Sequence, residues 1–173
     1  MTQTLNSDFP AELSKQVVEW RRHLHRHPEL SFQEHRTAQF VEDALRKLPN
    51  LTVSRPTPTS VLAVLKGQAG PGKTVLLRAD MDALPIEEES QQPYRSGTEG
   101  MMHSCGHDGH TTMLLGAAKY LAETRNFDGT VHFIFQPAEE GGGGGKVMVD
   151  EGLFRRFPCD AVYGLHNDPA IPL

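Results

Sequence analysis

Apolar residues recur at helical spacing near the start of the chain. The first such series is Leu13, Val17, Trp20 and Leu24. Pro10 suits a first helical turn and Pro28 suits a stop, so the pattern predicts an amphipathic helix between them.

A second helix is predicted directly afterwards. Ser31 and Glu34 have the spacing of a capping box, in which each side chain bonds to the other residue's backbone N–H group. The helix should end near Pro49 and Asn50, where its apolar series stops. That series is Thr37, Val41, Ala44 and Leu48.

Shorter apolar runs further along the chain predict strands. The runs at 61–65 and 74–78 are joined by a turn-rich loop. Those at 131–135 and 161–165 are expected to be buried strands, separated by a Gly-rich turn and a short helix. A helical pattern returns at 113–121. Because strands and helices alternate, the sequence predicts an α/β fold, layered α/β/α, with a largely parallel (mixed) sheet.

The composition suits one ordinary globular domain. The 173 residues are 38% hydrophobic and 7% aromatic, and no linker or internal repeat divides them. Lys and Arg number 17 against 22 Asp and Glu, and no basic block could neutralise a phosphate backbone, which argues against a nucleic-acid partner. The first ten residues are polar and no apolar run could span a bilayer, so we expect a cytoplasmic protein without a membrane partner. In that compartment Cys105 and Cys159 should not form a disulfide.

The densest group of reactive side chains is MHSCGHDGH at 102–110, between a loop and a predicted helix. Cys105 and His107 can point the same way from an extended or turn backbone, and Gly106 between them permits a close approach. Thiolate and imidazole both suit zinc or similar ions, so the two residues could share a metal centre. The spacing equally allows a buried cysteine beside surface histidines.

Two adjacent carboxylates follow the run 131–135. Glu139 and Glu140 lie just past the carboxyl end of a predicted strand, where open α/β sheets place their ligands. Adjacent side chains point in different directions, which suggests that one binds metal and the other acts as a general base. A solvated pair in a loop is the plain alternative.

The glycine run 141–145 followed by Lys146 invites comparison with a phosphate-binding loop. Glu140 stands in place of its first glycine and Val147 in place of its Ser or Thr, so nucleotide binding is disfavoured. The glycines instead suit a backbone that passes close to a metal site before a helix starts.

Further candidates stand at strand ends. His166 follows the run 161–165 and could be another ligand. Asp80 and Asp82 close the second predicted strand and share one face, so either could orient a ligand. Solvated strand-end carboxylates are the alternative.

Three histidines on the first predicted helix form a weaker candidate. His23 and His27 are one turn apart, and His25 lies between them. Arginines nearby make the surroundings cationic, which disfavours a bound dication. We interpret these histidines as surface or capping residues.

Four ordered motifs together resemble the amidohydrolase branch of the M20 metallopeptidases, which includes hippurate hydrolases, N-acyl-amino-acid deacylases and auxin-conjugate hydrolases. The motifs are LRADMDALP (77–85), MHSCGHDGH (102–110), FQPAEEGGGG (135–144) and GLH (164–166). The likeness runs from about Ala11 to the last residue. Ser104 and Gly145 depart from the usual motifs, and neither stands at a ligand position.

The resemblance implies a role for each candidate. The positions that match the family's metal ligands are Cys105, His107, Glu140 and His166. Glu139 matches the general base, and Asp82 matches the aspartate that supports the ligands. The family usually holds two divalent metal ions, zinc or manganese among them and cobalt or nickel as further options, in a zinc-peptidase-like catalytic domain.

Family members are considerably longer than 173 residues. The resemblance therefore implies that residues 1–173 are the N-terminal portion of the catalytic domain. The dimerisation or lid domain and the C-terminal catalytic segment, which carries a further histidine ligand and substrate contacts, would lie outside it. The full-length protein could be a homo-oligomer.

The implied activity is metal-dependent hydrolysis of N-acetyl, benzoyl or similar N-acyl amino acids or short peptides. A metal-bound hydroxide would attack the amide, with Glu139 as general base and later as acid. Two alternatives stay open. One is a truncated chain that binds metal but is catalytically inactive, and the other is a small module in which Cys105, His107 and His166 hold a structural ion.

Overall fold

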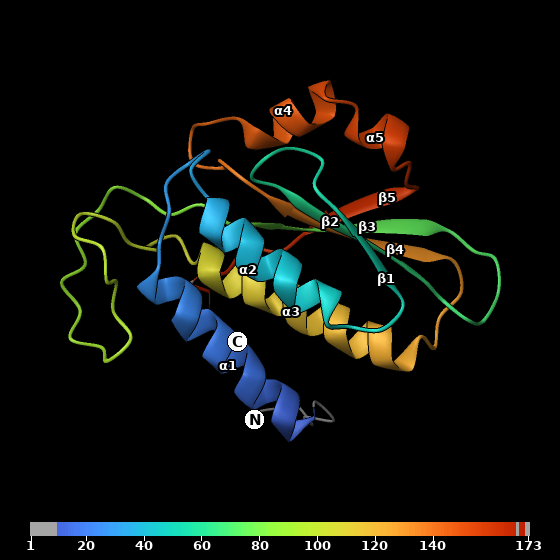
Figure 1. Ribbon diagram of the computed structural model, residues 1–173, viewed down its shortest axis with the longest axis horizontal. Coiled ribbons are helices and arrows are strands. Elements are labelled where there is room, and N and C mark those ends of the chain that lie inside the picture. The colour runs from blue at the N-terminus through green and yellow to red at the C-terminus, as the bar shows by residue number, and fades with distance from the viewer. Residues whose placement is uncertain (1–9, 169, 172–173) are drawn as a thin grey trace.

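The fold is a five-stranded mixed sheet with helices on both faces (Figure 1). The computed structural model describes residues 10–168 and 170–171. The helices are α1 (Ala11–Arg26), α2 (His35–Arg46), α3 (His107–Thr124), α4 (Gly144–Asp150) and α5 (Leu153–Arg156). The strands are β1 (Leu51–Ser54), β2 (Val61–Lys66), β3 (Thr74–Asp80), β4 (Thr130–Gln136) and β5 (Ala161–Gly164).

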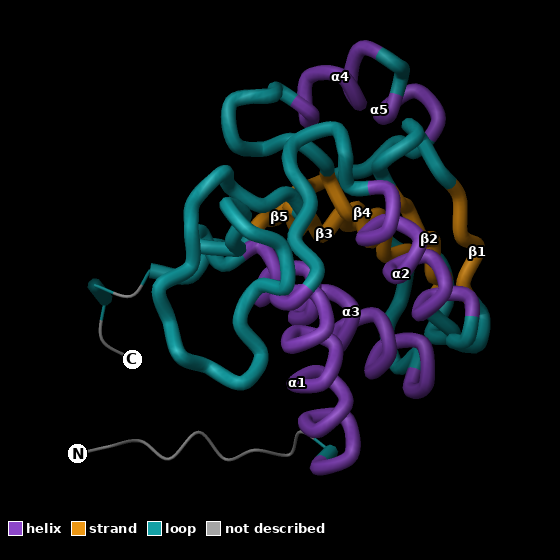
Figure 2. Tube along the Cα trace, turned by 60° about the vertical axis from the view of Figure 1, so that its left-hand side comes forward, coloured by secondary structure: helices purple, strands orange, loops and turns teal. Residues whose placement is uncertain are grey.

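The helices form two layers around the sheet. α2 and α3 pack on one face and α1 packs against α3, while α4 and α5 lie on the opposite face (Figure 2). This arrangement confirms the predicted layered α/β fold.

Strand direction brings three strand ends together. The order is β1-β2-β4-β3-β5, in which β3 runs parallel to both of its neighbours and β1 and β2 pair antiparallel. Asp80 pairs with Gln136 and Arg78 pairs with Gly164, so β3, β4 and β5 end at one edge of the sheet. Segments that leave these strands therefore start close to one another.

Side-chain alternation along the central strands builds two cores. In β2, Val61, Ala63 and Leu65 belong to the core under α2 and α3. Leu62, between them, packs into the smaller core under α4 and α5. This period of two is the pattern expected for strands covered on both faces.

The predicted helices and strands are found, with changes at their ends. α3 begins at His107 rather than near 113. The apolar pattern missed this start because the buried residues of the first turn are polar. The four-residue β1 was not predicted. β5 was expected to be buried, but it pairs on one side only among the described residues, and Val162 and Tyr163 are 51% and 61% exposed. Within the described part of the chain, no helix is both long and apolar enough to cross a membrane.

The predicted capping box at the start of α2 is wrong. Glu34 precedes the helix, but neither it nor Ser31 makes a side-chain cap. Glu29 instead accepts hydrogen bonds from the N–H group and the hydroxyl of Thr37, at 2.8 and 2.9 Å. Ser31 and Glu34 are thereby left for the tertiary contacts described below.

The interpretation of His25 as a surface or capping residue is also wrong. His25 is 4% exposed and lies between two carboxylates, with Nδ1 2.8 Å from Asp108 and Nε2 3.3 Å from Glu88. Arg21 also reaches Asp108, at 2.8 Å. The cluster ties α1 to the first turn of α3 and to the loop that follows β3.

Replacing His25 should cost more stability in mild acid than in mild base. The hydrogen bond with Asp108 raises the pKa of His25, so the pairing stabilises the fold fully below the unfolded pKa of about 6.5 and is lost as the pH rises through the folded value. We expect His25→Gln to lose about 1–3 kcal/mol at pH 6 and less at pH 8. Urea denaturation at both pH values measures this, with the exposed His35→Gln as the matched control. An equal loss at both pH values would contradict the pairing.

Candidate metal centre

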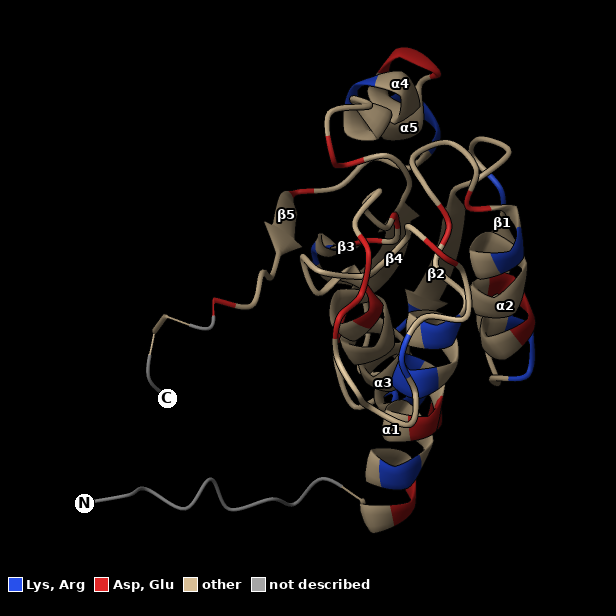
Figure 3. Cartoon of the chain, turned by 90° about the vertical axis from the view of Figure 1, so that its left-hand side faces the viewer, with Lys and Arg blue, Asp and Glu red and all other residues tan. Residues whose placement is uncertain are grey.

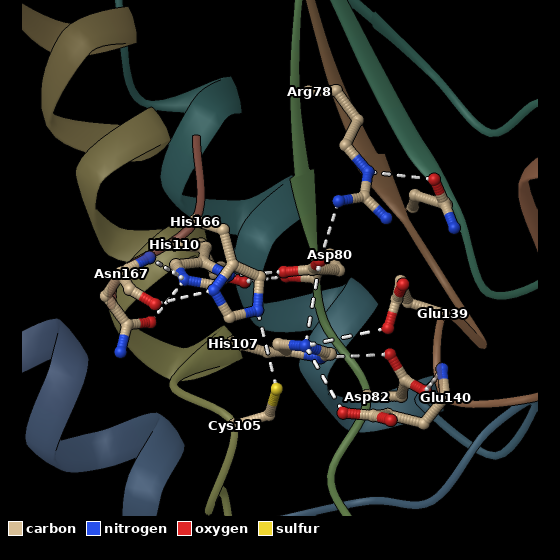
Figure 4. A network of polar contacts seen from close by, with 12 residues as sticks. Arg78, Asp80, Asp82, Cys105, His107, His110, Glu139, Glu140, His166 and Asn167 are labelled. Carbon is tan, nitrogen blue, oxygen red and sulfur yellow. Dashed lines mark hydrogen bonds and ion pairs between the residues drawn. The ribbon is translucent and has the colours of Figure 1, made fainter. Parts of the chain in front are cut away.

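The candidate site lies where β3, β4 and β5 end. Figure 3 views this edge of the sheet, where acidic residues gather near the ends of β3 and β4, while α1 carries both basic and acidic residues. Figure 4 shows the site residues: Asp80, Asp82, Cys105, His107, His110, Glu139, Glu140 and His166. They come from the strand ends and from the start of α3, so the predicted candidates are brought together by the parallel sheet.

His107 is at the centre of the site. Its side chain is fully buried, and Nδ1 lies 3.2 Å from Asp82 Oδ1. Its Nε2 has no hydrogen-bond partner among the described residues. Glu140 Oε1 and Glu139 Oε2 lie 3.7 and 3.9 Å from this nitrogen. Burial lowers the pKa of His107, but the hydrogen bond with Asp82 and the charges of the surrounding carboxylates outweigh it and raise the pKa.

Cys105 completes the opposite side of the site. Its Sγ lies 3.4 Å from His166 Nε2. Burial first, and then the neighbouring Glu140, raise the pKa of the Cys105 thiol to about 11. The thiol therefore keeps its proton at neutral pH unless a cation binds beside it.

Asp82 fixes the geometry around His107. It is 1% exposed and accepts hydrogen bonds from the Ser31 hydroxyl at 2.8 Å and from the Glu140 backbone N–H at 3.0 Å. Burial raises the pKa of Asp82, but these bonds and the one with His107 lower it to about 2. An ionised Asp82 accepts the Nδ1 proton of His107 and so directs the lone pair of Nε2 into the site.

The loop after β4 is held in place by the buried carboxyl group of Glu34. Ala138 has a positive φ of 51°, and its N–H donates to Glu34 Oε1 at 2.8 Å. Gly144 also meets Pro137 so closely that a Cβ would lie 1.9 Å from its carbonyl oxygen. The glycine therefore lets the loop after β4 fold closely onto its own backbone. Glu139 and Glu140 both bring a carboxylate oxygen close to His107, with side chains 42% and 25% exposed, so the expectation that adjacent side chains point in different directions is wrong here.

The donor set fits a divalent cation. Three groups of side chains each bring their ligand atoms within 4.8 Å of one another: Cys105–His107–His166, His107–Glu139–Glu140 and Asp80–His107–His110. Sulfur, imidazole nitrogen and carboxylate oxygen are the donors that zinc and similar ions accept, and the bare Nε2 of His107 faces them. The solvated alternative does not hold for Asp80 and Asp82, which are 0% and 1% exposed.

Several site residues have contacts that the sequence did not predict. Asp80 Oδ1 lies 2.6 Å from His110 Nδ1, and Asn167 reaches the other ring nitrogen. Ser31 and Glu34 reach the site from the segment before α2. The one local signal was that His107 and His110 are three residues apart and therefore share a helix face.

Comparison with known proteins identifies the family. The family model described as "Peptidase family M20/M25/M40" matches residues 76–173, more than half of the chain. The chain belongs to this family. The match confirms the resemblance drawn from the four sequence motifs.

Two curated relatives and one solved structure show how far the M20 likeness extends. An N-acyl-L-amino acid amidohydrolase of Geobacillus stearothermophilus is 52% identical over 90% of this chain, and the hippurate hydrolase of Campylobacter jejuni is 47% identical over 91%. The match spans 42% and 41% of those proteins' own lengths. The YXEP protein of Bacillus subtilis, described as a dinuclear metal binding peptidase from the M20 family, superimposes with a TM-score of 0.88 at 38% identity. That superposition covers 94% of this chain and 46% of the YXEP chain.

Glu34→Gln should become more stable relative to the unaltered protein as the pH rises. Burial raises the pKa of Glu34, so its ionisation costs the folded state stability as the pH rises above the unfolded value of about 4.5. Gln keeps the oxygen that accepts from Ala138 but removes the charge. We expect a relative gain of about 1 kcal/mol between pH 4.5 and pH 7, measured by denaturant unfolding.

Glu42→Gln, within the helix that Glu34 precedes, is the matched control with the opposite sign. Hydrogen bonds from Arg55 and Arg46 lower the pKa of Glu42, so its stabilisation is present above the unfolded pKa and lost as the pH falls. This variant should lose stability at pH 7 relative to pH 4. If both variants followed the same trend with pH, the role of Glu34 would be refuted.

Proposed function

We propose that this chain supplies the ligands of a two-metal amidohydrolase centre. The proposed ligands are Cys105, His107, Glu140 and His166. The observation that carries the proposal is the buried Nε2 of His107, which has no partner among the described residues and faces donors suited to a divalent cation. The description of YXEP as a dinuclear metal binding peptidase supports a pair of ions.

We further propose that the substrate is an N-acyl amino acid. The names of the two curated relatives, N-acyl-L-amino acid amidohydrolase and hippurate hydrolase, support this class. Hippurate is N-benzoylglycine, so an N-acyl amino acid is the class that both names share, and we propose an N-acetyl or benzoyl amino acid as a simple member of that class.

Glu139 is the proposed general base. Its carboxylate lies 3.9 Å from His107 Nε2, close to the ligand cluster, and it is the more exposed of the two adjacent glutamates. It can accept a proton from the attacking water and pass it to the departing amine nitrogen. The bound ions would lower the pKa of water and polarise the carbonyl group.

Residues 1–173 are proposed to form the N-terminal part of the catalytic domain. The curated relatives are more than twice as long as the matched segment. We therefore propose that turnover needs ligand and substrate contacts supplied by the rest of the full-length protein, and that this chain alone binds metal without appreciable turnover.

Metal binding by the 173-residue chain is the first test. Titration with Co²⁺ should produce a thiolate-to-cobalt charge-transfer band in the near ultraviolet, because Cys105 is a proposed ligand. Cys105→Ser should remove the band. Cys159→Ser is the matched control, since Cys159 packs against the core under α4 and α5 and should leave the band intact.

The same titration separates the alternatives. A stoichiometry of two ions supports the proposed centre, whereas a single ion in a closed site of four protein ligands would favour a structural module. A band that survives in Cys105→Ser would contradict the ligand assignment.

Glu139→Gln should separate metal binding from turnover in a version of the protein extended to the relatives' length. We expect unchanged metal content and a fall in kcat of about 10²–10⁴-fold on hippurate or N-acetyl amino acids, because only proton transfer is lost. The exposed Glu151→Gln is the control and should keep normal turnover. Normal turnover in Glu139→Gln would refute the role of general base.

A further inference from the structure

Asp80 and His110 form a buried pair with no part in the proposed mechanism. Both are nearly inaccessible, at 0% and 2% exposed, and Asp80 Oδ1 lies 2.6 Å from His110 Nδ1. Arg78 donates to the other Asp80 oxygen at 2.6 Å and to Gln136 at 2.9 Å. The pair is therefore locked in place by the ends of β3 and β4.

His110 is poorly suited to bind metal, although its ligand atoms lie close to those of His107. Its Nδ1 faces Asp80, and its Nε2 accepts from the backbone N–H of Asn167 at 3.1 Å. The side-chain oxygen Oδ1 of Asn167, which can only accept a hydrogen bond, also lies 2.5 Å from this nitrogen and accepts from it when the ring carries both protons. Neither ring nitrogen is left for an ion, and Arg78 already balances the charge of Asp80.

The segment that carries His166 has little other support. Leu165 is 65% exposed, and residues 165–168 form no helix or strand. Among the described residues, the hydrogen bonds that join 165–168 to the rest of the fold run through Asn167 to His110 and through His166 to Cys105.

Asn167 also fits the backbone beneath it. A Cβ on Gly106 would lie 2.3 Å from Asn167 Oδ1, so the glycine makes room for this side chain. The carbonyl oxygen of Asn167 lies 2.6 Å from His166 Nδ1, which directs His166 Nε2 toward Cys105. The rings of His110 and His166 meet edge to face at 4.5 Å.

We infer that Asp80 and His110 are positioning residues that hold Asn167, and through it set His166 at the metal centre. The inference rests on the proposed function, because it takes His166 as a ligand. It adds a supporting contact to that ligand in the way that Asp82 supports His107. Loss of such a supporting contact typically weakens metal binding about 10–100-fold.

The test is a double-mutant cycle in Co²⁺ affinity on the 173-residue chain, followed by the cobalt absorption spectrum. Asn167→Ala removes the Oδ1 contact with His110 but keeps the two backbone bonds of residue 167, so it should weaken binding about 10-fold and shift the cobalt spectrum toward that of His166→Ala. In the His166→Ala background, Asn167→Ala should have no further effect, because its action passes through His166. His110→Gln, which removes the imidazole bridge but keeps a polar side chain, should behave in the same way.

Asp168→Ala is the matched control. Asp168 is an exposed neighbour whose side chain accepts, among the described residues, only from the backbone N–H of Ala170, so its loss should leave Co²⁺ affinity unchanged. Because Asn167 is also exposed, Asn167→Ala should keep the fold, which far-ultraviolet circular dichroism can verify.

The outcomes separate the inference from the proposed function. The positioning role is overturned if His166→Ala weakens Co²⁺ binding while Asn167→Ala does not. It is also overturned if Asn167→Ala lowers the Co²⁺ affinity by the same factor in the His166→Ala background. In both cases the assignment of His166 as a ligand stands. If His166→Ala leaves the affinity unchanged, or the unaltered chain binds no Co²⁺, both are overturned. Non-additive loss in Asn167→Ala and His110→Gln supports both.

Discussion

The architecture around the site depends on two buried carboxylates at the end of β3. Ionised carboxylates withdrawn from water are costly unless donors or cations surround them. Asp82 obtains its donors from the segment before α2, the first turn of α3 and the loop after β4. Asp80 obtains its donors from Arg78 on its own strand and from His110 on α3. Satisfying these two residues therefore brings together the segments that carry the proposed ligands and base.

The same negative charges favour the protonated forms of His107 and Cys105 when no ion is bound. The pKa values of His107 and of the Cys105 thiol are both raised, in part by the carboxylates around them. A divalent cation would displace those protons and balance the negative charges in their place. The affinity for the metal should therefore increase as the pH rises. The acidic surroundings thus favour the charge of the metal while they disfavour a free thiolate.

Local periodicity was enough to predict most of the fold, but contacts distant in sequence were not visible in it. α1, β2, β3 and β4 were predicted because their apolar residues repeat at the period of a helix or strand. The four-residue β1 carries too short a pattern, and the exposure of β5 depends on what lies beside it rather than on its own residues. Ser31 and Glu34 have the local spacing of a capping box, yet the Ser31 side chain donates to Asp82 and the Glu34 side chain accepts from the Ala138 N–H group. The proposed ligand set came from resemblance to a family, whereas the link from His110 to Asn167 spans 57 residues and has no local signature.

The HDGH sequence at 107–110 shows why spacing alone recovers only part of a site. His107 and His110 are three residues apart, so both project from α3 toward the end of β3, where Asp82 and Asp80 meet them. Asp108 projects instead toward α1, where Arg21 and His25 reach it. The first turn of α3 therefore places two histidines at the site on one side and binds α1 through Asp108 on the other. Because Arg21 and His25 of α1 bind Asp108, the residue next to His107, the position of His107 depends on these contacts as well as on Asp82. The first turn of α3 consequently links the stability of the helical layer to the geometry of the proposed metal centre.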